Sequence, residues 1–225
     1  MKIDIQCGMR FQRMSHRQDA DATGKIDIRA LFALVIPLLV SSCAAPDRQH
    51  QIVISTADQK LALLDGGKIT AVYPVSTSKF GLGDWPGSYC TPVGELEIAQ
   101  KIGQGAPTGM VFKDRRDTGE IVWADAPGRD PIVTRILWLR GREAQNANAF
   151  RRNIYIHGTP EERDIGLPVS YGCIRMRSSD VIHLFSTVGI GTRVTIVDLP
   201  MSSMIPDFSS AAQLAKSGTS SAALR

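Results

Sequence analysis

A thiol and an imidazole lie sixteen positions apart in the segment "HGTPEERDIGLPVSYGCIRMR", residues 157–177. A cysteine attacks a carbonyl carbon as its thiolate, and a histidine can take the thiol proton near neutral pH. Cys173 and His157 therefore have the chemistry of a base-activated nucleophile. Taken singly, each has a plainer explanation: Cys173 as a buried, unreactive thiol, and His157 as a strand-end histidine without a catalytic role.

The residues around both side chains favour the catalytic explanation. "NIYIHGT" alternates apolar and polar residues, which predicts a strand with the histidine at its end, where Gly158 lets the chain turn. Gly172 allows the backbone before the thiol to bend, so that successive N–H groups can point at one oxyanion. Arg175 and Arg177 supply positive charges that would lower the pKa of the thiol.

Together, the His-Gly segment and the run Ser170-x-Gly-Cys-x-Arg, followed by Asp180, resemble the active-site signature of the L,D-transpeptidases of bacterial cell walls, the YkuD-type family. The similarity extends over residues 51–198 and includes "TPVGELEI" at 91–98 and "TRILWLRG" at 134–141. One position departs from the pattern, because Tyr171 stands where many members have a histidine. A phenol can still donate a hydrogen bond, so we expect a changed rate rather than a lost activity.

The resemblance implies a role for each matched residue. Cys173 attacks the substrate, and His157 takes the thiol proton and later returns one to the leaving amine. The backbone N–H groups of Gly172 and Cys173, with Tyr171, help to stabilise the oxyanion, and Arg175 fixes the cysteine loop or binds a substrate carboxylate. Structural members of the motif are Gly158, Ser170 and Asp180, although Asp180 also fits an acid that simply begins a helix.

The resemblance implies an activity on peptidoglycan stem peptides. The thiol forms a thioester with the third residue of a stem and passes the acyl group to an acceptor amine, on another stem or on a protein. No metal or organic cofactor is implied, and the chain has no His-Glu-x-x-His, Cys-x-x-Cys or dinucleotide glycine motif. Two alternatives stay open: an L,D-carboxypeptidase or hydrolase that hands the same acyl group to water, and a non-catalytic wall-binding lipoprotein.

Short apolar runs separated by glycine and proline predict a mainly β, single-domain, β-sandwich-like fold over residues 51–198. The runs are "QIVIST", "KLALLDGGKITAVYPVST" with a hairpin at Asp-Gly-Gly, "VGELEIAQKI", "GEIVWAD", "PIVTRILWLRG", "NIYIHG" and "TRVTIV". "SSDVIHLFSTV" predicts a helix that begins near Ser178 or Ser179. "TPEE" predicts a short helix with Thr159 as N-cap and Glu162 completing a capping box. Residues 103–131 form either a mobile wall over a groove or an ordinary surface insertion.

The two ends of the chain lie outside this domain. The apolar run "ALFALVIPLLV" at 30–40 follows Lys25 and Arg29 and is too short to span a membrane, which is typical of a secretory signal. "VSSC" follows it and resembles a lipobox. We therefore expect a signal sequence over 1–42, lipidation of Cys43, a linker over 43–50 and a flexible tail over 199–225. The expected product is a periplasmic lipoprotein anchored to a membrane, with a plain cleaved signal as the alternative.

Charge and cysteine usage add two expectations. The formal net charge is +4, but residues 43–225 carry twenty Lys or Arg against eighteen Asp or Glu, with no basic run interleaved with aromatic residues. A nucleic-acid partner is therefore not expected. Beyond the signal and the anchor, the cysteines are Cys90 and Cys173. A disulfide between them is conceivable in an oxidising compartment, but it would block the nucleophile, so Cys90 is expected to be a free thiol.

Overall fold

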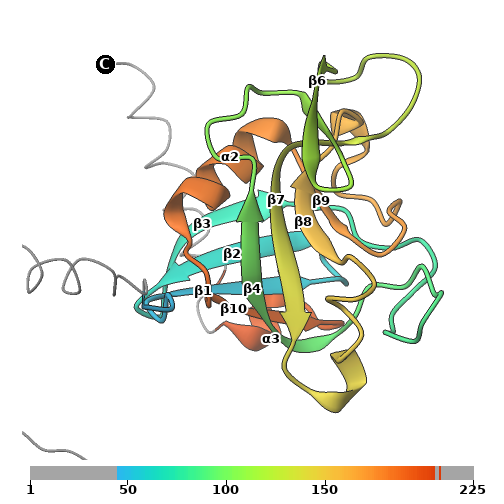
Figure 1. Cartoon of the computed structure of the whole chain (residues 1–225). Helices are drawn as coiled ribbons and strands as arrows, with labels where there is room; N and C mark the ends of the chain where they lie inside the picture. Colours follow the sequence, from blue (N-terminus) through green and yellow to red (C-terminus); the bar gives the residue numbers. More distant parts are fainter. Residues whose placement is uncertain (1–44, 206–207, 209–225) are drawn as a thin grey trace, which may run out of the picture. The chain divides into compact units, whose positions relative to one another are not determined.

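Ten β-strands form a single mixed sheet in the computed structural model, which describes residues 45–205 and Phe208 (Figure 1). The strand order is β3-β2-β1-β10-β4-β7-β5-β6, and β8 pairs with both β7 and β9. The pairs β1–β10 and β8–β9 are parallel and the others antiparallel. In chain order the elements are β1 (His50–Ser55), β2 (Lys60–Asp65), β3 (Lys68–Pro74), β4 (Gly94–Ile102), β5 (Met110–Lys113), β6 (Arg116–Ile121), β7 (Ile132–Gly141), η2 (Ala144–Asn146), β8 (Tyr155–Gly158), η3 (Glu162–Asp164), β9 (Ile174–Met176), α2 (Ser178–Thr187), β10 (Arg193–Val197) and α3 (Met201–Met204).

The prediction of a mainly β fold is confirmed, and each predicted apolar run overlaps at least one strand, although β6 shares only its last three residues with "GEIVWAD". The hairpin between β2 and β3 turns at Gly66 and Gly67, which have φ of +54° and +82°. Both values are unfavourable for residues with a side chain, so the two glycines are the reason for the tight turn. Two strands were not predicted, β5 and β9, and both are only three or four residues long.

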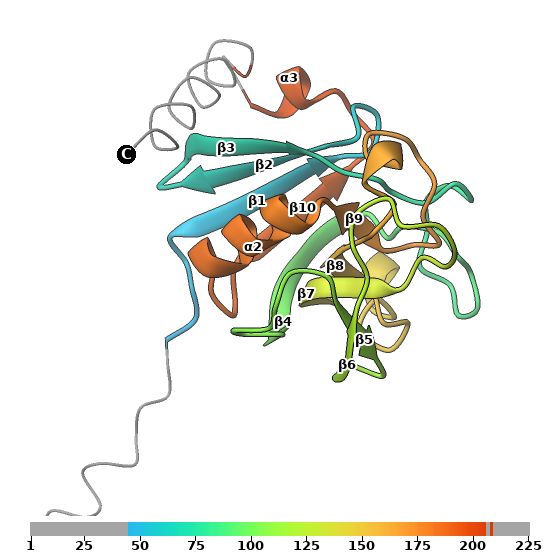
Figure 2. The same cartoon turned by 90° about the horizontal axis from the view of Figure 1, so that it is seen from above.

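The sheet bends so that its two halves enclose one core (Figure 2). Strands β1, β2 and β10 supply Ile and Leu side chains from one half, and β4, β7, β8 and β9 supply them from the other. Helix α2 packs on β7 and β8 and adds Val181, Leu184 and Phe185 to the same core. The two facing layers of the predicted sandwich are therefore halves of one continuous sheet.

The helix predicted near Ser178 begins there, but its capping differs from the prediction. The Ser178 N–H donates to Glu162 Oε1 at 2.7 Å, so the acceptor at this helix start comes from sixteen residues earlier in the chain. The helix predicted at Thr159 is only the 3-10 turn η3. Because Glu162 is occupied by the start of α2, it does not form the predicted capping box, and the Thr159 hydroxyl donates to Asp130 Oδ1 at 2.5 Å.

Packing of the described chain extends beyond both predicted domain bounds. At the start, Asp47 accepts hydrogen bonds from Gly189 N–H (2.7 Å) and Thr192 Oγ1 (2.9 Å), which ties the predicted linker to the segment before β10. At the end, α3 follows β10, and both Met201 and Phe208 are buried against β2. Met201 and Phe208, which belong to the predicted tail over 199–225, therefore pack on the domain. The predicted signal sequence, Cys43 and most of the predicted tail lie outside the described residues.

Asp47 gives a test of how the chain start is held. Burial alone would raise its pKa, but N–H groups of His50 and Gly189, together with the side chains of His50 and Thr192, hold the pKa well below its usual range. We expect Asp47→Ala to lower the free energy of unfolding in urea by about 2–3 kcal/mol at pH 7, because hydrogen bonds to a charged group are lost. Since the folded pKa is depressed, this difference is present above about pH 4 and shrinks as the pH falls further.

The matched control is Asp65→Ala, which removes an exposed carboxylate that accepts one side-chain bond, from Gln49. It should change stability by less than about 1 kcal/mol. Equal urea midpoints for the two variants at pH 7 would contradict a special role for Asp47.

Candidate active site

The parallel pairing of β8 with β9 brings the two halves of the sequence motif together. Ile156 pairs with Ile174 and His157 with Arg175, so one further step back places Cys173 beside Tyr155. Side chains alternate between the faces of a strand. Since Ile156 and Ile174 point into the main core, His157 and Arg175 lie on the opposite face, and the Cys173 side chain packs with Tyr155 in a second cluster.

The spacing of this pairing sets the separation of the two reactive groups. From the usual distance between strands and the rise per residue, the Cα atoms of His157 and Cys173 lie about 8 Å apart. Side chains on one face can meet across such a diagonal. The recorded hydrogen bond of the thiol runs to Asn153 O at 3.4 Å, and that of the imidazole runs to Gly158 O at 2.8 Å.

The turn before Cys173 is held by three hydrogen bonds. Ser170 Oγ donates to Cys173 O at 2.6 Å and accepts from Gly172 N–H at 3.2 Å, and Thr91 Oγ1 donates to Gly172 O at 3.0 Å. Gly172 has φ of +114°, and a Cβ at this position would lie 3.1 Å from Cys90 O. The predicted bend at Gly172 is therefore present. Its N–H, however, is directed to Ser170 rather than being free for an oxyanion.

Glycine is needed at position 158 for a different reason from the predicted one, which was a turn of the chain after His157. It is the last residue of β8 and does not turn the chain. A Cβ there would lie 2.7 Å from Val133 O and 3.3 Å from a methyl group of Val181. Glycine at this position allows β7 and α2 to approach the strand that carries His157.

The tautomer of His157 follows from its partner. The side chain is buried, and its Nδ1 lies 2.8 Å from the carbonyl of Gly158, which can only accept a hydrogen bond. Nδ1 therefore carries the proton and Nε2 is the unprotonated nitrogen, the atom that can act as a base. Burial lowers the pKa of His157 to about 4, with the Gly158 carbonyl raising it, Arg175 lowering it and Asp130 raising it.

The surroundings of the Cys173 thiol favour its protonated form. Burial raises the pKa of Cys173 to about 11, against the lowering effects of the Tyr155 N–H and of the Arg175 and Arg152 guanidinium groups. Arg175 lowers the thiol pKa as expected, but desolvation outweighs it, and Arg177 is not among the groups that act on the thiol. Arg177 contributes its charge near Asp180 instead. The resting site pairs a neutral thiol with a neutral imidazole.

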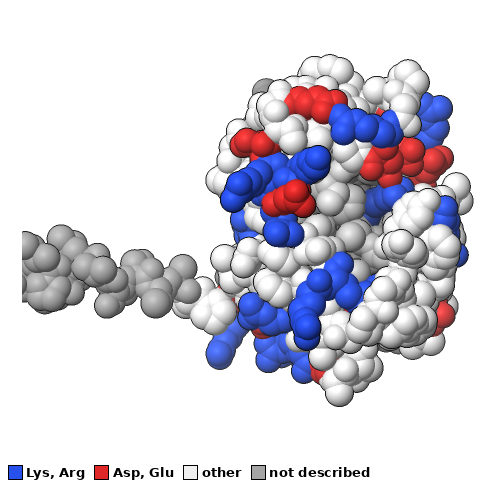
Figure 3. Space-filling model, turned by 45° about the vertical axis from the view of Figure 1, so that its right-hand side comes forward, with Lys and Arg blue, Asp and Glu red and all other residues white. Residues whose placement is uncertain are grey.

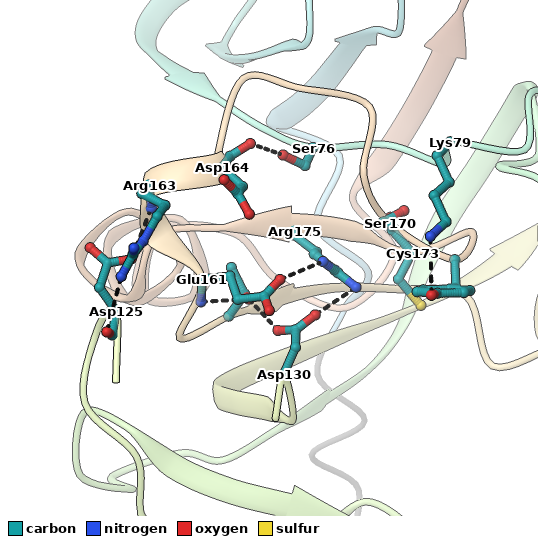
Figure 4. Close-up of polar contacts among 12 residues, drawn as sticks. Ser76, Lys79, Asp125, Asp130, Glu161, Arg163, Asp164, Ser170, Cys173 and Arg175 are labelled. Atoms are coloured by element: carbon teal, nitrogen blue, oxygen red, sulfur yellow. Dashed lines mark hydrogen bonds and ion pairs between the residues drawn. The ribbon is translucent and has the colours of Figure 1, made fainter. Parts of the chain in front are cut away.

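Arg175 is held by two carboxylates (Figure 4). Its guanidinium lies 2.6 Å from Asp130 Oδ2 and 3.5 Å from Glu161 Oε2, and the side chain is about 10% exposed. Backbone bonds between Arg175 and Ser76 hold β9 on its other side. Of its two predicted roles, this geometry favours fixing the cysteine loop, because its charge is already compensated. Asp130 and Glu161 were not found from the sequence, where "TPEE" was taken only as the start of a short helix.

The recorded contacts of Tyr171 and Asp180 are with groups other than the thiol and the imidazole. Tyr171 is 54% exposed, and its hydroxyl accepts a hydrogen bond from Lys79 Nζ at 3.1 Å. Because the hydroxyl accepts this bond, its own proton stays free to donate, and the role of Tyr171 as an oxyanion donor remains a prediction. Asp180 lies in the first turn of α2 and contacts Ser179, and burial raises its pKa. The described contacts of Asp180 fit the alternative explanation, an acid at the start of a helix.

A buried ion pair that was not predicted from the sequence holds the loop that packs against the turn before Cys173. Arg152 contacts Asp84 Oδ1 at 2.6 Å, and both side chains are at least nine-tenths buried. The guanidinium also donates to the carbonyls of Gly83, Ser88 and Cys90. Cys90 O is the nearest of the atoms that a Cβ at Gly172 would meet. Removing one partner of such a pair costs about 3–5 kcal/mol, so the loop over 83–90 is firmly fixed beneath the turn.

Residues 103–131 form one side of the site. Arg115, at the tip of the β5–β6 hairpin, donates to Asn153 Oδ1 at 3.2 Å and to the Tyr155 hydroxyl at 3.4 Å. Behind the tip, residues 102–107 and the hairpin line a hollow of about 660 Å³. This hollow borders the cluster in which Cys173 packs with Tyr155 and Phe112. Of the two interpretations of this segment, its position favours the wall of a groove.

Four further features of the described residues concern metal ligands, membrane-spanning helices, surface charge and the state of the cysteines. No group of three or more His, Cys, Asp or Glu side chains within 45–205 and Phe208 is arranged to hold a metal ion. None of the helices in this part of the chain is long and apolar enough to cross a membrane. Basic and acidic side chains lie side by side on the face drawn in Figure 3. Cys90 and Cys173 are both free thiols.

Comparison with known proteins gives a consistent answer. Residues 49–196 match the family model described as the L,D-transpeptidase catalytic domain, YkuD. The chain is 61% identical to "Putative L,D-transpeptidase YkuD" of Bacillus subtilis over 165 residues, which are 73% of this chain and 74% of that protein. It is 33% identical to "Probable L,D-transpeptidase YbiS" of Escherichia coli over 160 residues, or 69% of this chain. The chain spans only 47% of the length of this second relative.

The protonation states of the site can be tested by alkylation. In a Cys90→Ala background, iodoacetamide should modify Cys173 slowly at pH 7, and the rate should still be rising at pH 10, because the raised pKa leaves little thiolate below that pH. The rate should show no step near pH 6.5, because His157 is already neutral there. Mass spectrometry of the peptide that contains Cys173 measures the rate. A plateau reached below pH 8 would indicate a thiolate–imidazolium pair and contradict the neutral resting site.

Proposed function

The chain belongs to the family of L,D-transpeptidase catalytic domains, and from this membership we propose that it cross-links peptidoglycan or attaches a protein to it through a Cys173 thioester. The observation that carries the proposal is the shared face of β8 and β9, on which an unprotonated Nε2 of His157 lies one diagonal step from Cys173. Family membership supports acyl transfer, and the geometry assigns the atoms. Its substrate is a stem peptide of peptidoglycan.

The first half-reaction forms the thioester. Cys173 Sγ attacks the carbonyl carbon of the third stem residue while His157 Nε2 takes the thiol proton. The C–N bond to the fourth residue then breaks, and the imidazolium returns its proton to the leaving amine. In the second half-reaction an acceptor amine attacks the thioester carbonyl and gives a proton to His157, which returns it to the departing Cys173 sulfur. One amide is broken and one is formed, so the reaction needs no oxidant and no cofactor.

The pKa values support general-base catalysis rather than a preformed thiolate. With a pKa of about 4, His157 is unprotonated throughout the neutral range and ready to accept a proton. With a pKa of about 11, the Cys173 thiol does not ionise on its own. Proton transfer and attack therefore occur together once a carbonyl carbon is in reach. This arrangement also protects an exported thiol from oxidation, which requires thiolate.

The proposed site of action is outside the cytoplasm. The apolar run at 30–40 followed by "VSSC" supports export and lipidation of Cys43, which would hold the catalytic domain at a membrane surface facing the wall. Peptidoglycan and its stem peptides lie in that compartment.

The acyl-enzyme gives the decisive test. Incubated with a disaccharide-tetrapeptide, the full-length protein should release the fourth residue and gain the mass of the acylated stem. Cys173→Ala should give neither, because Cys173 is the thiol that the β8–β9 pairing places near His157. The matched control is Cys90→Ala, which removes the other described free thiol and should retain the adduct. An adduct that survives Cys173→Ala, or that disappears only in Cys90→Ala, would end the proposal.

A further inference from the structure

Three aromatic side chains gather on the surface beside the nucleophile turn. Phe80, Tyr89 and Tyr171 have ring centroids 5.5–5.7 Å apart, and each residue is 50–58% exposed. These three rings are called the aromatic platform below. Side chains of this size are usually placed in a core, and exposed apolar clusters on soluble domains mark interaction sites. Tyr171 is two residues from Cys173, so the platform borders the site.

The platform is held in place before any ligand arrives. Ser78 Oγ donates to Tyr89 O at 2.6 Å and accepts from Phe80 N–H at 2.9 Å. The Cys90 thiol donates to Phe80 O at 3.2 Å. Lys79 N–H donates to Ser170 O, which joins this loop to the loop that carries Tyr171. Three segments of the chain therefore fix the rings, and binding costs little ordering of side chains.

The ammonium group of Lys79 lies against the aromatic platform. Lys79 Nζ lies 4.4 Å from the centroid of Tyr171 and 5.3 Å from that of Phe80, and it donates to the Tyr171 hydroxyl. The surface thus combines apolar ring faces with an ammonium group and two phenol hydroxyls at their edges. Figure 4 shows the Lys79 side chain with the hydrogen bond that its ammonium group donates.

From these contacts we propose that the aromatic platform binds the glycan strand of peptidoglycan, with a sugar ring stacked on Phe80 and Tyr89. This inference rests on the proposed function and names the part of its substrate that the platform recognises. A pyranose ring has one face of C–H bonds, which carry partial positive charge and are attracted to the negative faces of aromatic rings. Its hydroxyl and acetamido groups lie at the rim, where Lys79 and the phenols can bond them.

The size of the platform favours a sugar over a protein partner. Three half-exposed aromatic side chains offer roughly 300 Å² of contact area. A stable protein interface needs about 800 Å² on each side. One or two sugar units match the smaller area.

The position of the platform also agrees with the length of the substrate. A stem whose third carbonyl lies at Cys173 is joined to its sugar through three residues, which span about 10 Å when extended. Tyr171 lies within two residues of Cys173, a span of at most about 7 Å. The sugar that carries the reacting stem can therefore reach the platform without leaving the site.

The test measures binding without chemistry. Full-length protein with Cys173→Ala is titrated with peptide-free glycan strands, and binding is followed by saturation-transfer NMR of the sugar C–H protons and by calorimetry. We expect saturation of the ring C–H protons. Phe80→Ala and Tyr89→Ala should each weaken binding about tenfold. Tyr89→Phe keeps the ring and should bind within about twofold of the parent.

The control variant is Ile190→Ala, which shortens another exposed side chain, beside Asp47 at the start of the described chain, and should leave binding unchanged. Melting temperatures verify that all variants are folded. Absence of saturation transfer, or equal affinities in all variants, would overturn the glycan site. If the Cys173 adduct forms while glycan does not bind, this inference alone fails. Glycan binding without any adduct would overturn the proposed acyl transfer and leave the platform as a carbohydrate site.

Discussion

The pairing of β8 with β9 is the constraint on which the site depends. Residues alternate between the faces of each strand, and Ile154, Ile156, Ile174 and Met176 are buried in the main core. Because these four side chains occupy the core face, the residues next to them in the chain lie on the other face, among them His157 and Arg175. A slip of one residue in either strand would move the isoleucines out of the main core and bring the polar side chains of His157 and Arg175 into it, so the hydrophobic pattern itself protects the register. Catalytic geometry here is a by-product of core packing.

The groups on the face of β8 and β9 that carries His157 and Arg175 explain why the nearby positive charge does not ionise the Cys173 thiol. Arg175 follows Cys173 by two residues and pairs with His157, but Asp130 and Glu161 compensate its charge. Desolvation acts on both reactive groups in the same sense: it raises the pKa of the thiol and lowers that of the imidazole, which keeps both neutral. Substrate binding has to supply the driving force for proton transfer, since the developing oxyanion and the imidazolium are stabilised only when a carbonyl is under attack. Reactivity is thereby confined to the occupied site.

Much of the fold could be predicted from the sequence, and the site only in outline. Long alternating runs gave β4 and β7, and glycine pairs gave the β2–β3 hairpin, because these signals are local. Strand β9 was missed because "IRM" is three residues long and buried throughout, which leaves no alternation to detect. The capping box at Thr159 failed because Glu162 binds the start of α2, a contact that only the folded chain creates. Arg152 and Asp84 are 68 positions apart, and no spacing rule relates them.

The turn before Cys173 and the aromatic platform share their supports, which would couple the proposed glycan binding to the proposed acyl transfer. The loop over 77–91 supplies Phe80 and Tyr89, and the same loop supplies Thr91, which bonds Gly172 O, and Cys90 O, against which Gly172 packs. Arg152 fixes this loop from the interior. A side chain at position 172 would press on the backbone of residues 89 and 90, and a movement of the platform would press back on the turn that carries Cys173. Close packing transmits such displacements because the interior has no room to absorb them. A ligand held on the rings therefore also stabilises the conformation of the nucleophile.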